Sequence, residues 1–300
     1  MITETQSSTK LHSNRIDFSL VPKLQALFEQ SPSPIICDRS VGNVFMWQAD
    51  LDTSFAECGG FGVLVEAYGG KTYYAPAGRR EDLVPAVNAL LDACGAPLLL
   101  CSIDEDELEP LRAVFGDRIE FTAQENAADY IYDADALRVY RGKKYHTQKN
   151  HVNAFLHDHP DYRFEPFTPD RAEALAAFFE EFETGDDDES ESAVEETLAC
   201  RRLLPMLPSL PLDTRLLTAG GEIVGFTVME KVGETLMIHI EKGLTRVRGV
   251  YPMLVTLEAN AYPDVRYINR EEDDGNEGLR RSKQSYRPIR LFQKYYAVIR

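Results

Sequence analysis

The sequence predicts an α+β protein made of two tandem α/β domains, each built on a mixed β-sheet with helices on both faces. The chain has 300 residues, which is about twice the size of a common domain. Both halves show the same order of β-hairpin, helix, strand, helix and strand, without residue-level identity between them. An apolar share of 44% is enough for ordinary packed cores. We therefore expect one domain at residues 1–150 and a second at residues 151–300.

In the first half, glycines and prolines separate segments of clear periodicity. Apolar residues at helical spacing predict a helix at residues 15–30, which Pro32 and Pro34 end. Gly69 and Gly70 join two alternating segments, which is typical of a β-hairpin. The expected strands lie at residues 62–68, 71–75, 97–103, 118–122 and 129–132, and the further helices at residues 81–94 and 104–115.

The second half repeats this order. Its expected helices lie at residues 170–182, 193–204, 251–262 and 276–283, and its strands at residues 214–218, 222–232, 235–241, 265–269 and 291–299. The acidic run at residues 186–191 is expected to be a solvated loop. An antiparallel meander that leads into a strand, a turn and a helix is typical of the GNAT acyltransferase fold. We therefore expect two tandem GNAT-like domains.

The chain is acidic, with 32 Lys and Arg residues, 49 Asp and Glu residues and a formal net charge of −17. Such a surface repels nucleic acids and anionic membranes at long range, so contact with either requires a local basic patch. The five cysteines form no C-x-x-C pair, which indicates a reduced, cytoplasmic setting. We find no signal peptide and no bilayer-spanning apolar run, and we expect the residues before 16 to be frayed. The oligomeric state is left open.

The first candidate site is the turn that follows the strand at residues 235–241. It contains Arg246, Arg248, Gly249, Val250 and Tyr251 and leads into a helix N-terminus. Exposed N–H groups, the helix dipole and two arginines favour an anion such as a phosphate or pyrophosphate. The GNAT fold holds coenzyme A at such a turn, but the bulky Tyr251 stands where a small residue is expected. A solvated loop is the alternative.

Two titratable residues, His239 and Glu241, precede this turn. Side chains alternate along a strand, so both residues are expected on one face. A carboxylate and an imidazole beside an anion site could take a proton from an attacking amine. Alternatively, Glu241 pairs with a neighbouring lysine or arginine, and His239 is a hydrogen-bonded core residue.

The second candidate site lies at the C-terminal end of the strand at residues 265–269. Strand ends of this kind bind ligands in open α/β sheets, so we expect substrate contacts from Asn269, Arg270, Asp273 and Lys283. Tyr286 is a candidate proton donor to a leaving group, or simply a hydrogen-bonding residue. Four consecutive acids, residues 271–274, resemble a metal site. Adjacent residues on a turn point apart, however, so we expect no metal.

The third candidate is a basic segment between the two halves. Arg138, Arg141, Lys143, Lys144 and Lys149 carry five positive charges, and no acid occurs in residues 136–156. Lysines interleaved with tyrosines can hold phosphates and stack bases. A phosphorylated donor such as a tRNA, or a lipid headgroup, fits this segment, and a basic interdomain helix is the alternative.

Five motifs together resemble the family defined by the C-terminal catalytic region of phosphatidylglycerol lysyltransferases. They are residues 43–47, 142–150, 239–242, 267–273 and 278–286, and the last two are the specific ones. The resemblance implies tandem GNAT-like domains and kinship with the Fem-type peptidoglycan aminoacyltransferases, which use aminoacyl-tRNA. It also implies a donor whose acyl carbon lies near Glu241. The lipid-modifying relatives carry membrane-spanning segments, whereas no such segment is found in this sequence. The acceptor is therefore left open.

These observations favour an acyl- or aminoacyl-transferase that acts on an amine or hydroxyl of a small molecule or lipid headgroup. The expected donor is an acyl-coenzyme A or an aminoacyl-tRNA. Glu241, with His239, is the candidate base, and Tyr286 the candidate acid. The alternatives are an acetyl-coenzyme-A-dependent N-acetyltransferase and a non-catalytic module that binds a phosphorylated ligand through the basic segment.

Overall fold

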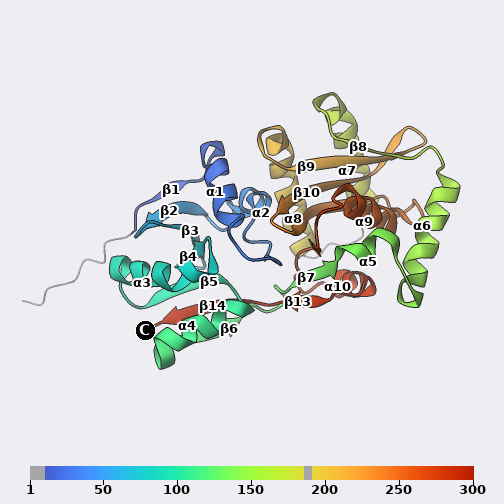
Figure 1. Cartoon of the computed structure of the whole chain (residues 1–300). Helices are drawn as coiled ribbons and strands as arrows, with labels where there is room; N and C mark the ends of the chain where they lie inside the picture. Colours follow the sequence, from blue (N-terminus) through green and yellow to red (C-terminus); the bar gives the residue numbers. More distant parts are fainter. Residues whose placement is uncertain (1–10, 186–190) are drawn as a thin grey trace, which may run out of the picture.

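The computed structural model describes residues 11–185 and 191–300 and contains two seven-stranded mixed sheets that lie side by side (Figure 1). The predictions of frayed residues before 16 and of a solvated loop at residues 186–191 fall largely outside the described residues. In the described part both are wrong, because strand β1 (Ser13–Arg15) pairs with β2 (Ser54–Cys58) and Glu191 begins helix α8 (Glu191–Leu203). Among the helices described, none is both long and apolar enough to cross a bilayer.

The first sheet has the strand order β1-β2-β3-β4-β5-β14-β6. Strands β1 to β4 form an antiparallel meander, β5 pairs parallel with β4, and β14 is antiparallel to β5 and β6. The predicted hairpin turn at Gly69 and Gly70 is confirmed, because Tyr68 pairs with Lys71. The bounds are β1 (Ser13–Arg15), β2 (Ser54–Cys58), β3 (Phe61–Tyr68), β4 (Lys71–Ala77), β5 (Leu98–Asp104), β6 (Ile119–Ala123) and β14 (Lys294–Ile299).

The second sheet has the order β13-β7-β12-β11-β10-β9-β8, which repeats the arrangement of the first. Strands β8 to β11 form the antiparallel meander, β12 is parallel to β11, and β7 is antiparallel to β12 and β13. The bounds are β7 (Asp129–Asp133), β8 (Arg163–Pro166), β9 (Asp213–Ala219), β10 (Glu222–Val232), β11 (Thr235–Gly243), β12 (Tyr267–Asn269) and β13 (Arg290–Phe292).

The helices cover the sheets, and several of them connect the two halves. Helix α2 contacts α8 and β10 of the second half, and α9 lies against α5, α6, β10 and β11. The largest apolar core joins residues of both halves, such as Phe45 and Phe226. The bounds are α1 (Val21–Phe28), α2 (Val41–Trp47), α3 (Leu83–Cys94), α4 (Leu108–Phe115), α5 (Ala134–Val139), α6 (His146–Asp158), α7 (Ala172–Gly185), α8 (Glu191–Leu203), α9 (Val250–Ala261) and α10 (Glu277–Ser285).

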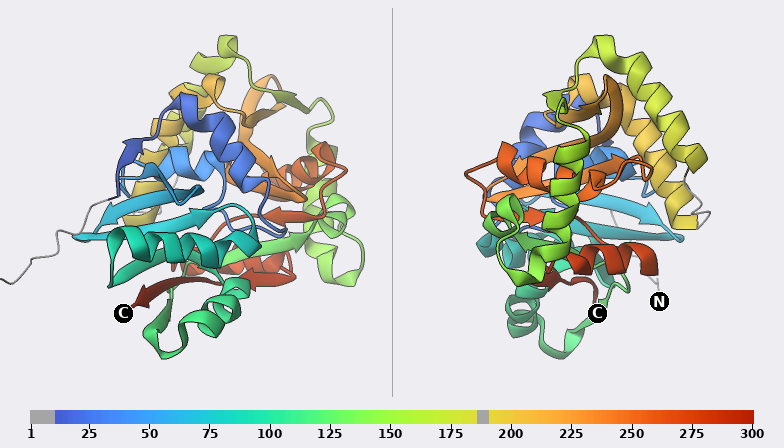
Figure 2. Two further views of the ribbon diagram at one scale, coloured as in Figure 1. Left: turned by 60° about the vertical axis from the view of Figure 1, so that its left-hand side comes forward. Right: turned by 90° about the vertical axis from the view of Figure 1, so that its right-hand side faces the viewer.

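The two halves exchange one strand each. Strand β7 of the first half lies between β12 and β13 of the second sheet, and β14 returns to lie between β5 and β6 of the first (Figures 1 and 2). The prediction of a single final strand at residues 291–299 is therefore wrong, because β13 and β14 pair in different sheets. The boundary expected at residue 150 does not separate two complete sheets.

Strands β11 and β12 diverge after a short parallel contact. Only Thr235–Met237 of β11 pair with β12, whereas β11 continues to Gly243. On its other side β11 stays paired with β10 to its end, through a β-bulge next to Val228. The divergence opens the second sheet at its centre, where side chains of β11 and of the loop after β12 face the first half.

Candidate functional site

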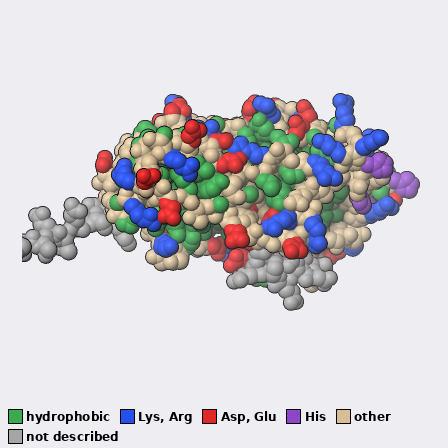
Figure 3. All heavy atoms as spheres, turned by 90° about the horizontal axis from the view of Figure 1, so that it is seen from below, with side chains coloured by type: hydrophobic (Ala, Val, Ile, Leu, Met, Phe, Trp, Pro, Cys, Tyr) green, Lys and Arg blue, Asp and Glu red, His purple; other side chains and the backbone are tan. Residues whose placement is uncertain are grey.

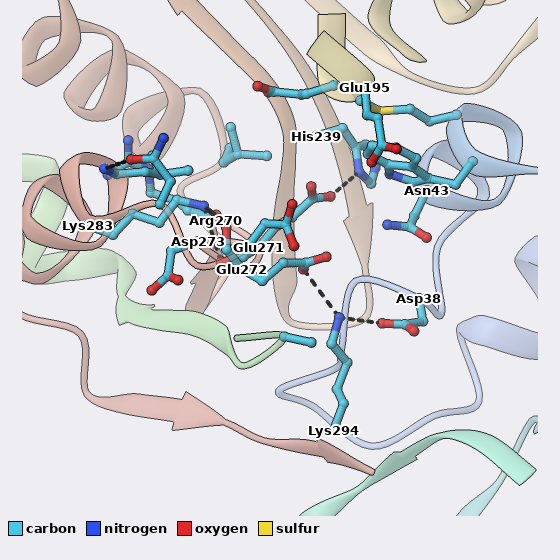
Figure 4. Close-up of a pocket in the computed structure, with 18 of the residues that line it drawn as sticks. Asp38, Asn43, Glu195, His239, Arg270, Glu271, Glu272, Asp273, Lys283 and Lys294 are labelled. Atoms are coloured by element: carbon cyan, nitrogen blue, oxygen red, sulfur yellow. Dashed lines mark hydrogen bonds and ion pairs between the residues drawn. The ribbon is translucent and has the colours of Figure 1, made fainter. Parts of the chain in front are cut away.

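A cavity of about 730 Å³ lies where β11 and β12 diverge, and both halves line it (Figure 4). We call it the central cavity. Its wall includes Asp38, Glu66, Tyr68, Cys101, His239, Glu241, Lys242, Tyr251, Arg270, Glu271, Glu272, Asp273, Lys283, Lys294 and Tyr296. His239, Glu241, Tyr251, Arg270, Asp273 and Lys283 were predicted from the sequence, so the structure brings these six together.

His239 is held between two carboxylates. Its Nδ1 lies 2.9 Å from Glu271 Oε1 and its Nε2 lies 3.2 Å from Glu230 Oε2, and the side chain is fully buried. Burial alone lowers the pKa of His239, but the two carboxylates outweigh it and raise the pKa to about 9. The ring is therefore an imidazolium at neutral pH. The predicted role of His239 as a base does not fit this state, because both of its nitrogens donate.

Glu230 also connects His239 to the first half. Its carboxylate accepts hydrogen bonds from the backbone N–H groups of Val41 (3.0 Å) and Gly42 (2.7 Å) at the start of α2. A Cβ on Gly42 would lie 2.4 Å from the His239 ring, so only glycine allows this approach. The sequence carried only a weak signal for Glu230, because β10 also contains Glu222, Thr227 and Lys231, and the burial of Glu230 is seen only in the structure.

Glu241 is paired with Arg270. Arg270 Nη2 donates to Glu241 Oε1 over 2.8 Å, and both side chains are 8% exposed. The Arg270 guanidinium lies 4.7 Å from the centre of the Tyr286 ring. Tyr286 is buried and does not line the cavity, and burial raises its pKa. The Tyr286 ring therefore packs against the Arg270 guanidinium, and its hydroxyl stays protonated.

The loop that follows β12 is fixed by Lys283. This buried ammonium donates to the carbonyl oxygens of Arg270 (2.6 Å) and Glu272. Glu271 has a φ of 54°, a left-handed conformation that costs free energy unless its surroundings impose it. Asn269 lies beneath the loop, outside the cavity wall, and accepts from the Glu271 N–H over 2.8 Å. These contacts hold the Glu271 carboxylate toward His239.

Lys294 of β14 holds a cluster of acids at the floor of the cavity. Its Nζ lies 2.8 Å from Asp38, 3.2 Å from Asp129 and 3.2 Å from Glu272 (Figure 4). Cys37, Asp129 and Glu272 offer donor atoms within 4.8 Å of one another, a spacing that suits a metal ion. The Lys294 ammonium already lies among these atoms, 3.3 Å from Cys37 Sγ, and supplies the positive charge there.

The wall contributed by the first half was missed by sequence reasoning. Glu66 lies 3.4 Å from the Cys101 thiol, and burial raises its pKa to about 7. The hydroxyls of Tyr68 and Tyr296 are 2.7 Å apart. Tyr296 belongs to β14, so this wall exists only because the last strand returns to the first sheet.

The central cavity carries more negative than positive groups. Of the described residues that line it, nine are Asp or Glu and four are Lys or Arg. All four of these residues, like the His239 imidazolium, already have partners. Lys242 pairs with Glu196 at 2.8 Å, and Arg270, Lys283 and Lys294 make the contacts given above. The cavity therefore favours a cationic group over an anionic one.

The predicted donor turn lies largely outside this cavity. Arg246 is half-exposed and bonded to Glu181 at 2.6 Å, and Arg248 is exposed. Gly249 is the N-cap of α9, with a φ of 81°, and Val250 is buried. Neither the two arginines nor Gly249 and Val250 line the cavity; of the predicted turn residues only Tyr251 does.

The basic segment is also separate from the cavity. Lys143, Lys144 and Lys149 are exposed on a short 3-10 helix (Lys143–Tyr145) and on α6, and none of them lines the cavity. Figure 3 shows histidine, lysine and arginine side chains gathered at the end of the molecule where α6 lies. Helix α6 packs on α9, whose Tyr251 lines the cavity.

One protein-family profile matches most of the chain. The profile of the family described as phosphatidylglycerol lysyltransferase, C-terminal, matches residues 33–298. A conserved protein of unknown function from Bacteroides thetaiotaomicron is 30% identical, with a TM-score of 0.85 and coverage of 97% of this chain and 100% of that chain. No curated protein sequence matches the chain.

Two more distant structures bear on the fold. L-PGS from Bacillus licheniformis is 16% identical, with a TM-score of 0.65 and coverage of 93% of this chain and 91% of that chain. FemX is 10% identical, with a TM-score of 0.61 and coverage of 95% and 97%. Together with the two mixed sheets, these likenesses confirm the predicted tandem GNAT-like fold.

Proposed function

The chain belongs to the phosphatidylglycerol lysyltransferase C-terminal family, and we propose that it transfers an aminoacyl group from aminoacyl-tRNA to an amine or hydroxyl. The acid-rich central cavity carries this proposal. A free α-amino group gives an aminoacyl ester a positive charge near its carbonyl carbon, and the surplus of carboxylates stabilises that charge. The phosphates of coenzyme A lack a comparable partner, because the cavity cations are already bonded.

In this proposal Glu241 is the base. The acceptor amine or hydroxyl attacks the ester carbonyl carbon while Glu241 takes its proton, and the C–O bond to the tRNA ribose then breaks. Glu241 returns the proton to the leaving ribose hydroxyl, so the carboxylate is regenerated. Arg270 keeps Glu241 oriented (2.8 Å), and backbone N–H groups at the end of β11 are the candidate donors to the oxyanion.

The other predicted residues receive positioning roles. His239 holds Glu271, Tyr286 supports Arg270, and Lys283 fixes the loop that carries both. Asp273 is bonded to Tyr130 at 2.5 Å and to Arg280 at 2.7 Å, which ties α10 to this loop.

The phosphates of the donor require contacts outside the cavity. Lys143, Lys144 and Lys149 form an exposed basic surface on which a tRNA backbone could bind. Arg246 and Arg248 are a second proposed phosphate contact, at the start of α9. The acceptor is a small molecule or a lipid headgroup, and the cytoplasmic location stays a prediction.

The test is a transfer assay with purified protein and radiolabelled aminoacyl-tRNAs. Lysyl- and arginyl-tRNA should release label to an acceptor at least about tenfold faster than aspartyl- and glutamyl-tRNA, a factor that corresponds to roughly 1.4 kcal/mol. Glu241→Gln should lower the rate by about 100-fold or more. Glu234→Gln, in the exposed β10–β11 turn, is the matched control.

Three results would argue against the proposal or its assignment of the base. Turnover with acetyl-coenzyme A and not with aminoacyl-tRNA would favour the N-acetyltransferase alternative. Saturable binding of tRNA without transfer to any acceptor would favour a binding module. Unchanged turnover in Glu241→Gln would remove Glu241 as the base.

A further inference from the structure

Glu258 is a buried acid that the proposed mechanism does not use. It lies on α9 and is 1% exposed. Neither of its carboxylate oxygens has a hydrogen-bond partner. A buried carboxylate without a donor is unusual, because its ionised form loses water and gains nothing in return.

The groups that face Glu258 show the same lack of partners. Glu241 of β11, Thr227 of β10 and Arg270 of the loop after β12 surround it. Thr227 pairs directly with Glu241 across the two strands, and α9 packs over both of them. Glu241 Oε2 and Thr227 Oγ1 also lack partners. Tyr286, which keeps its proton, is the remaining titratable neighbour.

A single proton shared within this cluster explains how the unpartnered oxygens of Glu258, Glu241 and Thr227 can be satisfied. The cluster holds a single cation, Arg270, and two carboxyl groups, Glu241 and Glu258. If both acids were ionised, one negative charge would be buried without compensation, which is strongly unfavourable. If one acid keeps its proton, the cluster is neutral and its O–H can donate to the other acid. The Thr227 hydroxyl can then donate to the remaining Glu258 oxygen.

We propose that Glu258 is a neutral carboxylic acid that donates a hydrogen bond to Glu241 Oε2 and so positions the proposed base from behind. Glu241 pairs with Arg270 through its other oxygen, which makes it the ionised member. Burial, together with the charge of Glu241, raises the pKa of Glu258 well above its ordinary value, which agrees with this assignment. Glu241 is then held through both oxygens, by a cation on one and an acid on the other.

That Glu258 is protonated does not depend on which reaction the protein catalyses. Its effect on turnover, through the position of Glu241, rests on the proposed function. Glu258 keeps its own proton throughout the cycle. Glu241 alone exchanges a proton with the acceptor and the leaving hydroxyl, so Glu258 is a positioning residue.

The experiment uses the full-length protein and the variants Glu258→Gln and Glu258→Leu. Infrared difference spectra at pH 8.5 should show the carbonyl band of a protonated carboxylic acid in the wild type that is missing in Glu258→Gln. That pH lies above the pKa of about 7 of Glu66, and subtracting Glu66→Gln provides the control. Gln keeps an N–H donor toward Glu241, so this variant should unfold at the same or a higher temperature than the wild type at pH 8.5.

The outcomes separate the proposal from the proposed function. An absent carboxylic-acid band, or a marked loss of stability in Glu258→Gln, would show that Glu258 is ionised and overturn the inference. With an active wild type, kcat should stay within about threefold in Glu258→Gln and fall at least about tenfold in Glu258→Leu; equal rates in both would refute the positioning role. If the wild type transfers nothing, the proposed function fails while the infrared result still decides the protonation of Glu258.

Discussion

Replacing His239 with glutamine tests the buried imidazolium most directly. His239→Gln removes the positive charge that compensates Glu230 and Glu271, and both carboxylates stay buried. Removing one partner of a buried pair typically costs about 3–5 kcal/mol. We therefore expect a large loss in the free energy of unfolding at pH 7 to 8.

The pH dependence of unfolding gives an independent value for the contribution of His239 to the free energy of unfolding. Folding raises the pKa of His239 from 6.5 to about 9. The stabilisation is fully present below pH 6.5 and is lost as the pH rises through 9. The difference in pKa corresponds to about 3 kcal/mol, since one pKa unit is about 1.4 kcal/mol. Buried acids with raised pKa values, such as Glu66 at about 7 and the neutral Glu258, also make stability fall as the pH rises. They are the same in the wild type and in His239→Gln, so the contribution of His239 is the difference between the two proteins.

The assay is denaturant unfolding between pH 6 and 9. The wild type should lose stability more steeply between pH 7 and 9 than His239→Gln does, by a total of about 3 kcal/mol over the titration of His239. His157→Gln is the matched control, because His157 is exposed and its side chain is 87% accessible. Equal slopes in the wild type and His239→Gln, or a loss below about 1 kcal/mol in the variant, would refute the imidazolium.

Three further predictions concern the backbone, the acid cluster and the first-half wall. Gly249→Ala should lower the free energy of unfolding, measured with urea, more than Gly221→Ala does. Both residues have a positive φ (81° and 84°), but of the two only Gly249 would place a Cβ in a collision, 2.2 Å from a backbone oxygen. Equal losses in the two variants would contradict this explanation. Lys294→Met should cost about 3–5 kcal/mol at pH 8 and less at pH 5, where the three acids it compensates can take up protons; a loss independent of pH would exclude the charge argument. Glu66→Gln should raise the melting temperature at pH 8 and leave it unchanged below pH 4. The pKa of Glu66 rises from 4.5 to about 7 on folding, so the wild-type protein loses stability as the pH increases through that range. A lower melting temperature of the variant at pH 8 would show that the ionised form of Glu66 is the stabilising one.

Local signals in the sequence located the second-half wall of the cavity. Polar residues at the ends of two successive strands, such as Glu241 and Arg270, can be recognised because strand ends and turns follow from periodicity and glycine placement. The hairpins follow for the same reason. The exact partners do not: whether Glu241 pairs with Lys242 or with Arg270 depends on how β11 and β12 diverge, which no local pattern encodes.

The first-half wall depends on long-range pairing. Glu66 and Tyr296 are more than two hundred positions apart in the chain, and they meet only because β14 enters the first sheet between β5 and β6. A run of apolar residues near the end of a chain predicts a strand but not the sheet it joins. The role of Glu230 depends in the same way on a long-range contact, because its carboxylate accepts a hydrogen bond from Gly42 of the first half.

The exchange of β7 and β14 also governs the order in which the protein can be assembled during translation. The first sheet lacks an interior strand until residues 294–299 have left the ribosome, although its other six strands are finished by residue 123. An N-terminal fragment therefore exposes two unpaired edges, at β5 and at β6, and a fragment of the second half alone lacks β7. Neither half is a self-sufficient folding unit, and the two sheets are expected to reach their cooperative native state only after residues 294–299 have been synthesised.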